Sequence, residues 1–183
     1  GKELLWFAPP QRALLFLDSF HTPRRLKRTL RQNPAEIRVN TCFREVISAC
    51  ATSTNRRDMQ RRTETGTWIT EQMIEGYLRL HEAGYCHSIE CFRSGQLIGG
   101  LYGVAIAGMF AGESMFYREP EASKRCLCFL ADYLSQRGVS WIDCQQITPL
   151  LAQFGAVEVP REEFMGLLEE VLSRDVVLFT RDV

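Results

Sequence analysis

The chain has 183 residues, of which 45% are hydrophobic, and its 22 Lys and Arg balance its 22 Asp and Glu. That length suits one large domain with its own core, and no stretch approaches the roughly 18–20 apolar residues of a membrane span. The seven cysteines are odd in number and lack the paired C-x-x-C spacing of a metal knuckle. They indicate reduced thiols and a cytoplasmic protein without a bound metal.

The zero net charge hides an asymmetry along the chain. Residues 1–62 hold 13 Lys and Arg against 5 Asp and Glu, whereas residues 63–183 hold 9 against 17. A basic half beside an acidic half favours one polyanionic partner and one cationic partner.

The first part of the chain alternates strands and helices before a polar stretch. A strand over Ala13–Leu17 is followed by a basic helix that Pro23 opens, with Thr22 as its N-cap. A short strand covers Glu36–Asn40, and the residues after it have the apolar spacing of a helix. Residues 53–65 are rich in Arg and Thr without apolar periodicity, which predicts a surface loop.

The rest of the chain has the pattern of a sheet with helices on its faces. Thr70 is expected to cap a helix that ends at Gly84. The later elements follow in this order: strands Cys86–Arg93, Leu97–Ala107 and Met109–Tyr117, helix Pro120–Gly138, strand Val139–Cys144, helix Thr148–Gly155, strand Glu158–Pro160 and helix Glu162–Leu172. This order predicts an α+β fold with a mixed, largely antiparallel sheet flanked by helices. It is also the order of the GNAT acyltransferase-like fold, an analogy of fold alone.

The turn where such enzymes hold acetyl-coenzyme A is unusual here. Members that bind this cofactor carry a Gly-rich pyrophosphate loop between the fourth strand and its helix. Residues 116–124 contain no glycine, and they include Glu119 and Glu121, which would repel phosphate. An acyl donor other than coenzyme A is therefore favoured.

The basic helix presents a cationic row. Arg24, Lys27, Arg28 and Arg31 recur at positions i, i+3, i+4 and i+7, so they share one face. Such a row destabilises a helix unless an anion lies against it. A solvated surface helix is the plain alternative, but a phosphate-binding face is favoured, with nucleic acid as the polyanion.

Two apolar strands each carry a polar insertion, at Gly112-Glu113-Ser114 and at Asp143-Cys144-Gln145. A lone carboxylate often caps a turn or pairs with Arg, but two such breaks suggest one pocket between the strands. Alternation places Gln145 on the face of Asp143, where its amide carbonyl could meet an incoming amine. Ser114 lacks a G-x-S-x-G elbow and no histidine triad is evident, which fits direct transfer without a covalent intermediate.

A set of aromatic and aliphatic residues could line a hydrophobic pocket or belong to the ordinary core. Its members are Trp68, Tyr77, Leu101, Phe110 and Leu130. Their spacing does not separate these two interpretations.

Seven short motifs occur in a fixed order along the chain. They are Gly66-Thr67-Trp68-Ile69-Thr70, Leu80-His81-Glu82-Ala83-Gly84, Cys86-His87-Ser88-Ile89-Glu90, Gly99-Gly100-Leu101-Tyr102-Gly103-Val104, Gly112-Glu113-Ser114-Met115-Phe116, Ala122-Ser123-Lys124 and Ile142-Asp143-Cys144-Gln145. Together they closely resemble the leucyl/phenylalanyl-tRNA–protein transferase family over nearly the whole chain.

The resemblance implies an aminoacyltransferase of the bacterial N-end rule pathway. It would move Leu or Phe, with Met as a further candidate, from aminoacyl-tRNA to a protein whose N-terminus is Arg or Lys, which marks that protein for degradation. The resemblance also implies a GNAT-like catalytic domain over residues 66–183, preceded by a basic tRNA-contacting portion over residues 1–65. It implies no metal and no coenzyme A, and we expect a monomer.

The same resemblance assigns roles residue by residue. Arg24, Arg28 and Arg31 match the family's tRNA-contacting cluster. Pocket positions for the aminoacyl side chain fall at Trp68, Tyr77, Leu101, Phe110 and Leu130, and acidic and polar pocket positions at Glu113 and Ser114. A proposed catalytic relay falls at Asp143 and Gln145, with Asp143 orienting Gln145 and the Gln145 carbonyl accepting a hydrogen bond from the attacking α-amine.

Four features depart from the family pattern. The loop over Ser53–Glu64 is longer than usual, and Leu150 stands where the family has a His before its Ala-Ser-Leu-Gly-Ala-like segment. Residues Trp6–Arg12 read Trp-Phe-Ala-Pro-Pro-Gln-Arg where the family usually has Trp-Trp-Ser-Pro-Asp-Pro-Arg. An upstream segment with a Gly-rich run and Phe-Pro-Trp is expected to precede residue 1. Two alternatives stay open: an aminoacyl-tRNA–protein transferase of different amino-acid or N-terminal specificity, and a tRNA-binding module without catalysis.

Overall fold

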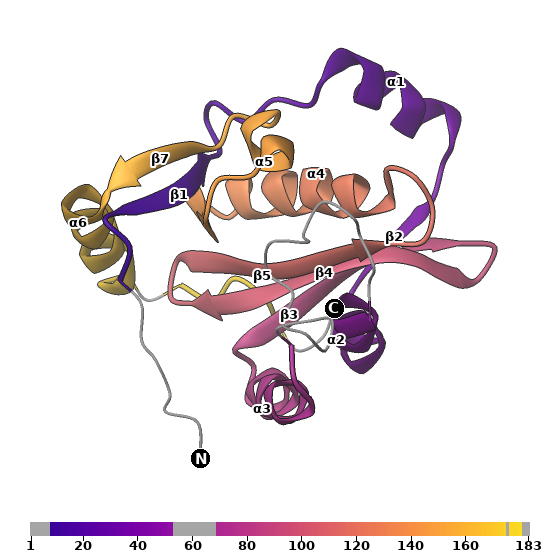
Figure 1. Ribbon diagram of the computed structural model, residues 1–183, viewed down its shortest axis with the longest axis horizontal. Coiled ribbons are helices and arrows are strands. Elements are labelled where there is room, and N and C mark those ends of the chain that lie inside the picture. Colours follow the sequence, from indigo (N-terminus) through magenta and orange to yellow (C-terminus); the bar gives the residue numbers. More distant parts are fainter. Residues whose placement is uncertain (1–7, 53–68, 175, 181–183) are drawn as a thin grey trace.

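Seven strands form one mixed sheet in the computed structural model, which describes residues 8–52, 69–174 and 176–180 (Figure 1). The strands are β1 Gln11–Phe16, β2 Glu36–Val39, β3 Cys86–Arg93, β4 Gln96–Ile106, β5 Met109–Tyr117, β6 Trp141–Gln145 and β7 Val157–Pro160. The helices are α1 Arg24–Gln32, α2 Phe43–Thr52, α3 Glu71–Glu82, α4 Ala122–Ser135, α5 Pro149–Ala152 and α6 Arg161–Leu172.

The sheet has the order β2-β3-β4-β5-β6-β1-β7. Every neighbouring pair is antiparallel except β5 and β6, which run parallel. Those two strands pair only where Phe110 lies beside Ile142 and Ala111 beside Asp143. Beyond that point they are no longer paired. The predicted α+β fold, with a largely antiparallel sheet and the GNAT-like order of elements, is confirmed.

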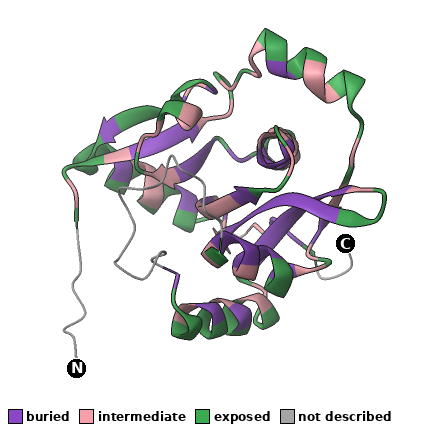
Figure 2. Ribbon diagram, turned by 45° about the vertical axis from the view of Figure 1, so that its right-hand side comes forward, coloured by how far each residue is buried: buried purple, intermediate pink, exposed green. Residues whose placement is uncertain are grey.

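Helices cover both faces of the sheet and divide the core into layers. Helix α4 lies on one face, and α2 and α3 lie on the other (Figure 1). One apolar cluster fills the space under α4, a second lies between the sheet and α2 and α3, and a third joins α6 to β1, β6 and β7. Figure 2 shows the buried residues concentrated in the central strands and on the inward side of α4.

Helix α3 begins and ends as its sequence predicts. The Thr70 side chain accepts a hydrogen bond from the Met73 N–H, which satisfies one free donor of the first turn. At the other end Gly84 adopts a φ of 86°. The N–H of Tyr85 then reaches the Leu80 carbonyl and the N–H of Gly84 the His81 carbonyl, a Schellman ending.

Helix α1 begins differently from the prediction. Pro23 itself occupies the N-cap position, and no side chain caps the helix. The assignment of Thr22 as N-cap is therefore wrong, because the proline lies one position earlier than expected. The Thr22 hydroxyl instead lies 3.4 Å from the Cys128 thiol of α4. Only Leu26 of α1 is buried, so the helix projects from the rest of the molecule.

Two strands from the first 65 residues belong to the same sheet as the later strands. Strand β2 pairs with β3, and β1 lies between β6 and β7. The division of the chain at residue 65 stays a prediction, and that boundary lies outside the described residues, as does the expected loop over residues 53–65. In the described part of the chain no helix has the length and apolar character needed to cross a membrane.

Candidate functional site

The first polar insertion is a β-bulge. Along the β4–β5 ladder Tyr102 lies opposite Ser114, but the next residue of β4, Gly103, lies opposite Gly112. Glu113 is therefore the extra residue. A bulge re-aims side chains and interrupts pairing, and bulges are common beside functional sites.

Because of this bulge, alternating residues of β5 that face one side of the sheet before Glu113 face the other side after it. Phe110, before it, packs in the cluster under α4, whereas Phe116, after it, packs in the cluster with α2 and α3. The two residues are six apart and would share a face in a regular strand. The change of face explains how an apolar strand accommodates two successive polar residues.

The second polar insertion is also an irregularity of the sheet. Along the β1–β6 ladder Leu14 lies opposite Asp143 and Ala13 opposite Gln145, so Cys144 is the extra residue. Gln145 adopts a φ of 63°, a left-handed conformation that a residue with a Cβ seldom takes. The regular alternation used to place Gln145 therefore ends at this point.

The two bulges meet across the point where β5 and β6 separate. The Glu113 carboxylate interacts with the Tyr77 hydroxyl from α3 and with the Gln145 side chain. Burial raises the pKa of Glu113 above its usual value, and the interactions with Tyr77 and Gln145 oppose that rise. The charge of Asp143 adds to the rise and that of Arg12 opposes it. We call Arg12, Tyr77, Glu113, Asp143 and Gln145 the two-bulge site.

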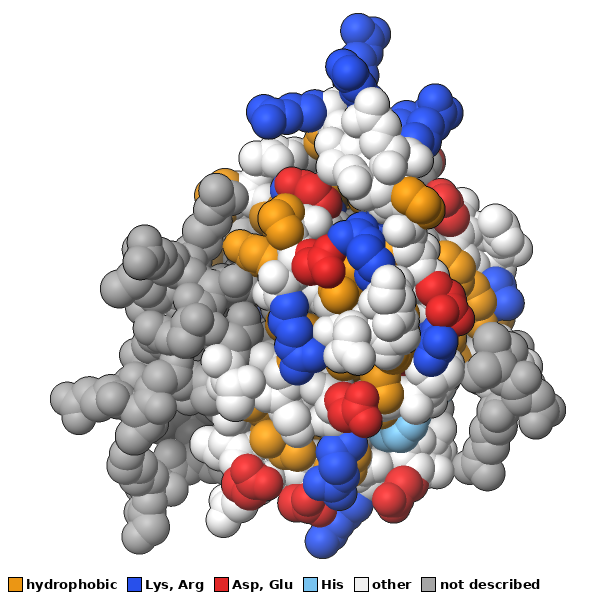
Figure 3. Space-filling view, turned by 90° about the vertical axis from the view of Figure 1, so that its right-hand side faces the viewer, with side chains coloured by type: hydrophobic (Ala, Val, Ile, Leu, Met, Phe, Trp, Pro, Cys, Tyr) orange, Lys and Arg blue, Asp and Glu red, His pale blue; other side chains and the backbone are white. Residues whose placement is uncertain are grey.

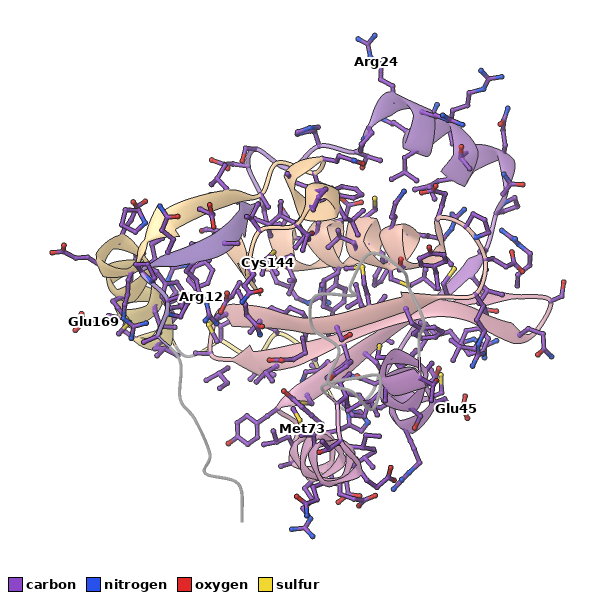
Figure 4. The ribbon with its side chains drawn as sticks, viewed as in Figure 1. Arg12, Arg24, Glu45, Met73, Cys144 and Glu169 are labelled. Carbon is purple, nitrogen blue, oxygen red and sulfur yellow. The ribbon has the colours of Figure 1, made fainter. Side chains whose placement is uncertain are left out.

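Asp143 lies at the buried end of the two-bulge site and is only 2% exposed. Its carboxylate accepts two parallel hydrogen bonds from Arg12, from Nε to Oδ1 at 2.9 Å and from the terminal nitrogen to Oδ2 at 2.7 Å. Oδ1 also accepts the backbone N–H of Gln145 at 2.8 Å. Figure 4 labels Arg12 and Cys144, which belong to the adjacent strands β1 and β6.

The structure brings only some of the predicted pocket residues together. Tyr77 and Glu113 share the two-bulge site, and the Ser114 side chain interacts with the Cys50 thiol of α2. Leu101, Phe110 and Leu130 belong to the cluster under α4, on the other face of the sheet, and are at most 3% exposed. Trp68 lies outside the described residues.

The C-terminal segment completes that cluster under α4. Leu178 and Phe179 are both buried there. The Phe179 ring lies 5.1 Å from the Tyr133 ring and 5.9 Å from the Phe110 ring, and the Tyr133 hydroxyl donates to the Leu178 carbonyl. Sequence patterns give no indication of this packing, because the segment has no periodicity.

The predicted cationic row is present on α1. Arg24, Lys27, Arg28 and Arg31 are all exposed, and so is Arg25. None of these five forms an ion pair with a residue in the described ranges. Figure 3 shows Lys and Arg side chains projecting where α1 lies, at the top of the molecule, and Figure 4 shows Arg24 pointing outward.

A cavity of about 220 Å³ lies between α1 and the first turn of α4, away from the two-bulge site. Its lining includes Arg93 and Arg125, but both cations are engaged. Arg93 pairs with Glu119, and Arg125 donates to the carbonyls at the end of α1. Glu121 adds a further carboxylate to the lining. This turn therefore offers little to a pyrophosphate. Across residues 8–52, 69–174 and 176–180, no group of three or more His, Cys, Asp and Glu is placed to hold a metal.

Arg12 is the functional residue that the sequence patterns did not single out. It is the final residue of the stretch that departs from the family's Trp-Trp-Ser-Pro-Asp-Pro-Arg, and it keeps the arginine of that motif. That retained arginine is the available signal. Its partner lies 131 positions away, so no local pattern could pair the two.

Comparisons with known proteins match nearly the whole chain. A family described as leucyl/phenylalanyl-tRNA protein transferase matches residues 14–169. Curated relatives bear the name leucyl/phenylalanyl-tRNA–protein transferase. The protein of Nitratidesulfovibrio vulgaris is 44% identical over 170 residues, which cover 93% of this chain and 70% of the relative. That of Novosphingobium aromaticivorans is 45% identical over 92% of this chain and 61% of its own length. That of Chlorobaculum parvum is 42% identical over 93% of this chain and 84% of its own length.

Solved structures resemble the chain in fold alone. L-PGS from Bacillus licheniformis superposes with a TM-score of 0.52 at 10% identity, over 90% of this chain and 65% of that one. A ribosomal-protein-alanine N-acetyltransferase from Brucella melitensis gives a TM-score of 0.42 at 13% identity, over 82% of this chain and 98% of that one.

Proposed function

Because the chain belongs to the leucyl/phenylalanyl-tRNA–protein transferase family, we propose that it transfers Leu or Phe from aminoacyl-tRNA to the α-amine of a protein. The acceptor bears Arg or Lys at its N-terminus, and the product is marked for degradation in the cytoplasm. The observation that carries the proposal is the two-bulge site, where Glu113, Asp143 and Gln145 meet at the separation of β5 and β6.

The basic helix provides the surface for tRNA. Its cations are exposed and not neutralised by neighbouring carboxylates of the described residues. Each contact with a phosphate releases counterions, which gives affinity without base specificity. Arg24, Lys27, Arg28 and Arg31 would hold the tRNA in this way.

The side chain of the amino acid requires an apolar environment. Leu101, Phe110 and Leu130 provide one under α4, and Phe110 lies beside Ile142, next to Asp143 in the ladder. Tyr77 lies on the other face of the sheet, beside Glu113, and Trp68 lies outside the described residues. An apolar surface near the reacting ester selects Leu and Phe over polar amino acids.

The chemistry is attack of the α-amine nitrogen on the ester carbonyl carbon. An amide bond forms, the bond to the tRNA ribose oxygen breaks, and a proton passes from the amine to that oxygen. A neutral amine fraction exists near pH 7, because the reference pKa of an α-amine is about 8. The ester is already activated, so correct positioning supplies much of the rate.

The two-bulge site has suitable groups for that positioning. The carboxylate of Glu113 would attract the cationic N-terminus of the acceptor. The Gln145 side chain interacts with Glu113, and we assign its amide carbonyl the role of accepting a hydrogen bond from the attacking amine. Ser114 adds a hydroxyl next to Glu113 on the same bulge.

Transfer of label tests the proposal. The protein is incubated separately with Leu-, Phe- and Met-tRNA carrying labelled amino acid, with an Arg-starting peptide and with the same peptide starting with Ala. We expect label from Leu and Phe on the Arg peptide, and loss of transfer in Asp143→Ala. Transfer of other amino acids alone would indicate a different specificity. Binding of tRNA without transfer would identify a non-catalytic module.

A further inference from the structure

The Arg12 side chain contacts Asp143 and Phe164. Its guanidinium makes both hydrogen bonds to Asp143, and its central carbon lies 5.2 Å from the centre of the Phe164 ring. The Arg12 side chain is 28% exposed and that of Asp143 is 3% exposed. A parallel pair of hydrogen bonds from a planar guanidinium fixes the orientation of a carboxylate, which a point charge cannot do.

The occupied oxygens of Asp143 limit what this residue can do. Oδ1 accepts from Arg12 and from the Gln145 backbone, and Oδ2 accepts from Arg12. Every hydrogen bond that this carboxylate accepts comes from an N–H group of a neighbouring residue, and two of them form a parallel pair with the Arg12 guanidinium. Asp143 therefore serves as a fixed acceptor for the Gln145 N–H rather than as a proton carrier.

That acceptor stabilises an unfavourable backbone conformation. Gln145 has a φ of 63°, where a Cβ is crowded. The hydrogen bond from its N–H to Asp143 holds this conformation, and the Gln145 side chain then reaches Glu113. Strained residues that persist at such sites are held by their surroundings.

We infer that Arg12 is a positioning residue for the transfer reaction, which fixes Asp143 and thereby the conformation of Gln145. This inference rests on the proposed function, because it assigns Arg12 a part in that reaction. Its effect passes through two successive hydrogen-bonded residues, Asp143 and Gln145.

The test is Arg12→Lys, which keeps the charge but not the two parallel hydrogen bonds. We expect kcat to fall by about 10- to 100-fold, since a misplacement of ~1 Å can cost that much. The KM for Leu-tRNA should stay within about twofold, because tRNA contacts lie on α1. Adding Asp143→Asn to Arg12→Lys should lower kcat little further, because both act through one unit.

The matched control is Arg38→Lys. Arg38 makes the same two-bond contact with Glu36, but on the edge strand β2, where the Glu36 side chain is 58% exposed. Its substitution should leave kcat and KM unchanged. Arg12→Lys could instead lower the melting temperature and leave kcat at the wild-type value when transfer is assayed well below that melting temperature. In that case Arg12 would be a structural residue and the inference would fail.

A second measurement works without turnover. Hydrogen exchange of the Gln145 amide, followed by NMR, should speed up by about tenfold or more in Arg12→Lys, because its acceptor is no longer fixed. Arg38→Lys should leave it unchanged. Equal exchange rates in wild type and Arg12→Lys would overturn the role of Arg12. Wild-type protein that transfers no amino acid would instead refute the proposed function, while the exchange experiment still decides the positioning of Gln145.

Discussion

Phe179 lies flat against His87, with ring centroids 4.1 Å apart and planes 14° from parallel. The imidazole is itself fixed, because Nδ1 lies 3.0 Å from the Asn40 amide nitrogen and Nε2 lies 3.1 Å from the Gly84 carbonyl. Nε2 must donate and Nδ1 must accept, so the ring is neutral. Burial accordingly lowers the pKa of His87 to about 4. The C-terminal segment thus docks on a rigid aromatic surface.

Substitution of Phe179 by Ala should therefore destabilise the fold. Removal of a buried phenyl ring typically costs about 3–5 kcal/mol. For a protein of this size we expect the melting temperature to fall by roughly 6–20 °C. Thermal denaturation followed by circular dichroism measures this. Val177→Ala is the control, because Val177 is 73% exposed and should change little. Equal melting temperatures for the two variants would show that the segment does not stabilise the core.

Gly103 is needed for space rather than for flexibility. A Cβ at this position would collide with the Ala111 carbonyl oxygen and with the Phe110 ring. Neither neighbour can yield, since one is backbone and the other is fully buried. Gly103→Ala should cost about 1–3 kcal/mol, the usual range for an overpacked core. Gly76→Ala is the control, because a Cβ there meets nothing within 4 Å. Urea denaturation of both variants compares them directly.

Local signals predict the elements well. Strands Cys86–Arg93 and Met109–Tyr117 have the predicted bounds, because apolar alternation and a short Gly turn are encoded next to each other. The ending of α3 at Gly84 is also predictable, since a C′ glycine acts within its own turn.

Partners from distant segments could not be predicted in the same way. The insertions at Glu113 and Cys144 are visible as polar breaks, but a bulge is a relation to a neighbouring strand. Arg12 finds Asp143 only because β1 lies beside β6. Regular alternation misplaces Gln145, because the bulge interrupts it. Phe179 has no periodic neighbours at all.

The cationic row on α1 leads to a prediction about salt. Replacing Arg24, Lys27, Arg28 and Arg31 together by Ala should weaken tRNA binding strongly at low salt. The slope of log affinity against log salt should fall by about 0.7–0.9 for each phosphate that the helix no longer neutralises. Ala favours helix, and repulsion between like charges disappears, so α1 should stay folded.

Fluorescence anisotropy at several salt concentrations measures this slope. Arg79→Ala with Arg161→Ala is the control, because both residues are exposed and lie on other helices. An unchanged slope in the α1 variant would place the tRNA surface elsewhere on the molecule.

Glu113 connects the stability of the fold to its activity. Burial raises the pKa of this carboxyl, so the folded state binds the proton more tightly than the unfolded state does. The contribution of Glu113 to the free energy of unfolding therefore increases as pH falls through the folded pKa toward the ordinary value of 4.5. That contribution is lost again as pH rises through the folded pKa. Glu113→Gln removes the buried charge. This variant should melt at a higher temperature than wild type at pH 7–8, with a difference that shrinks toward pH 4.5.

The same substitution should impair transfer, because an uncharged amide no longer attracts a cationic N-terminus. We expect a higher KM for the Arg-starting peptide and unchanged affinity for tRNA, since the α1 surface is intact. Glu75→Gln on the exposed side of α3 controls for loss of one negative charge, and it should change neither quantity. A Glu113→Gln protein that gained stability and kept its peptide KM would show that the buried charge has no part in acceptor binding. Loss of both stability and transfer would show instead that the carboxylate is chiefly a structural acceptor for Tyr77 and Gln145.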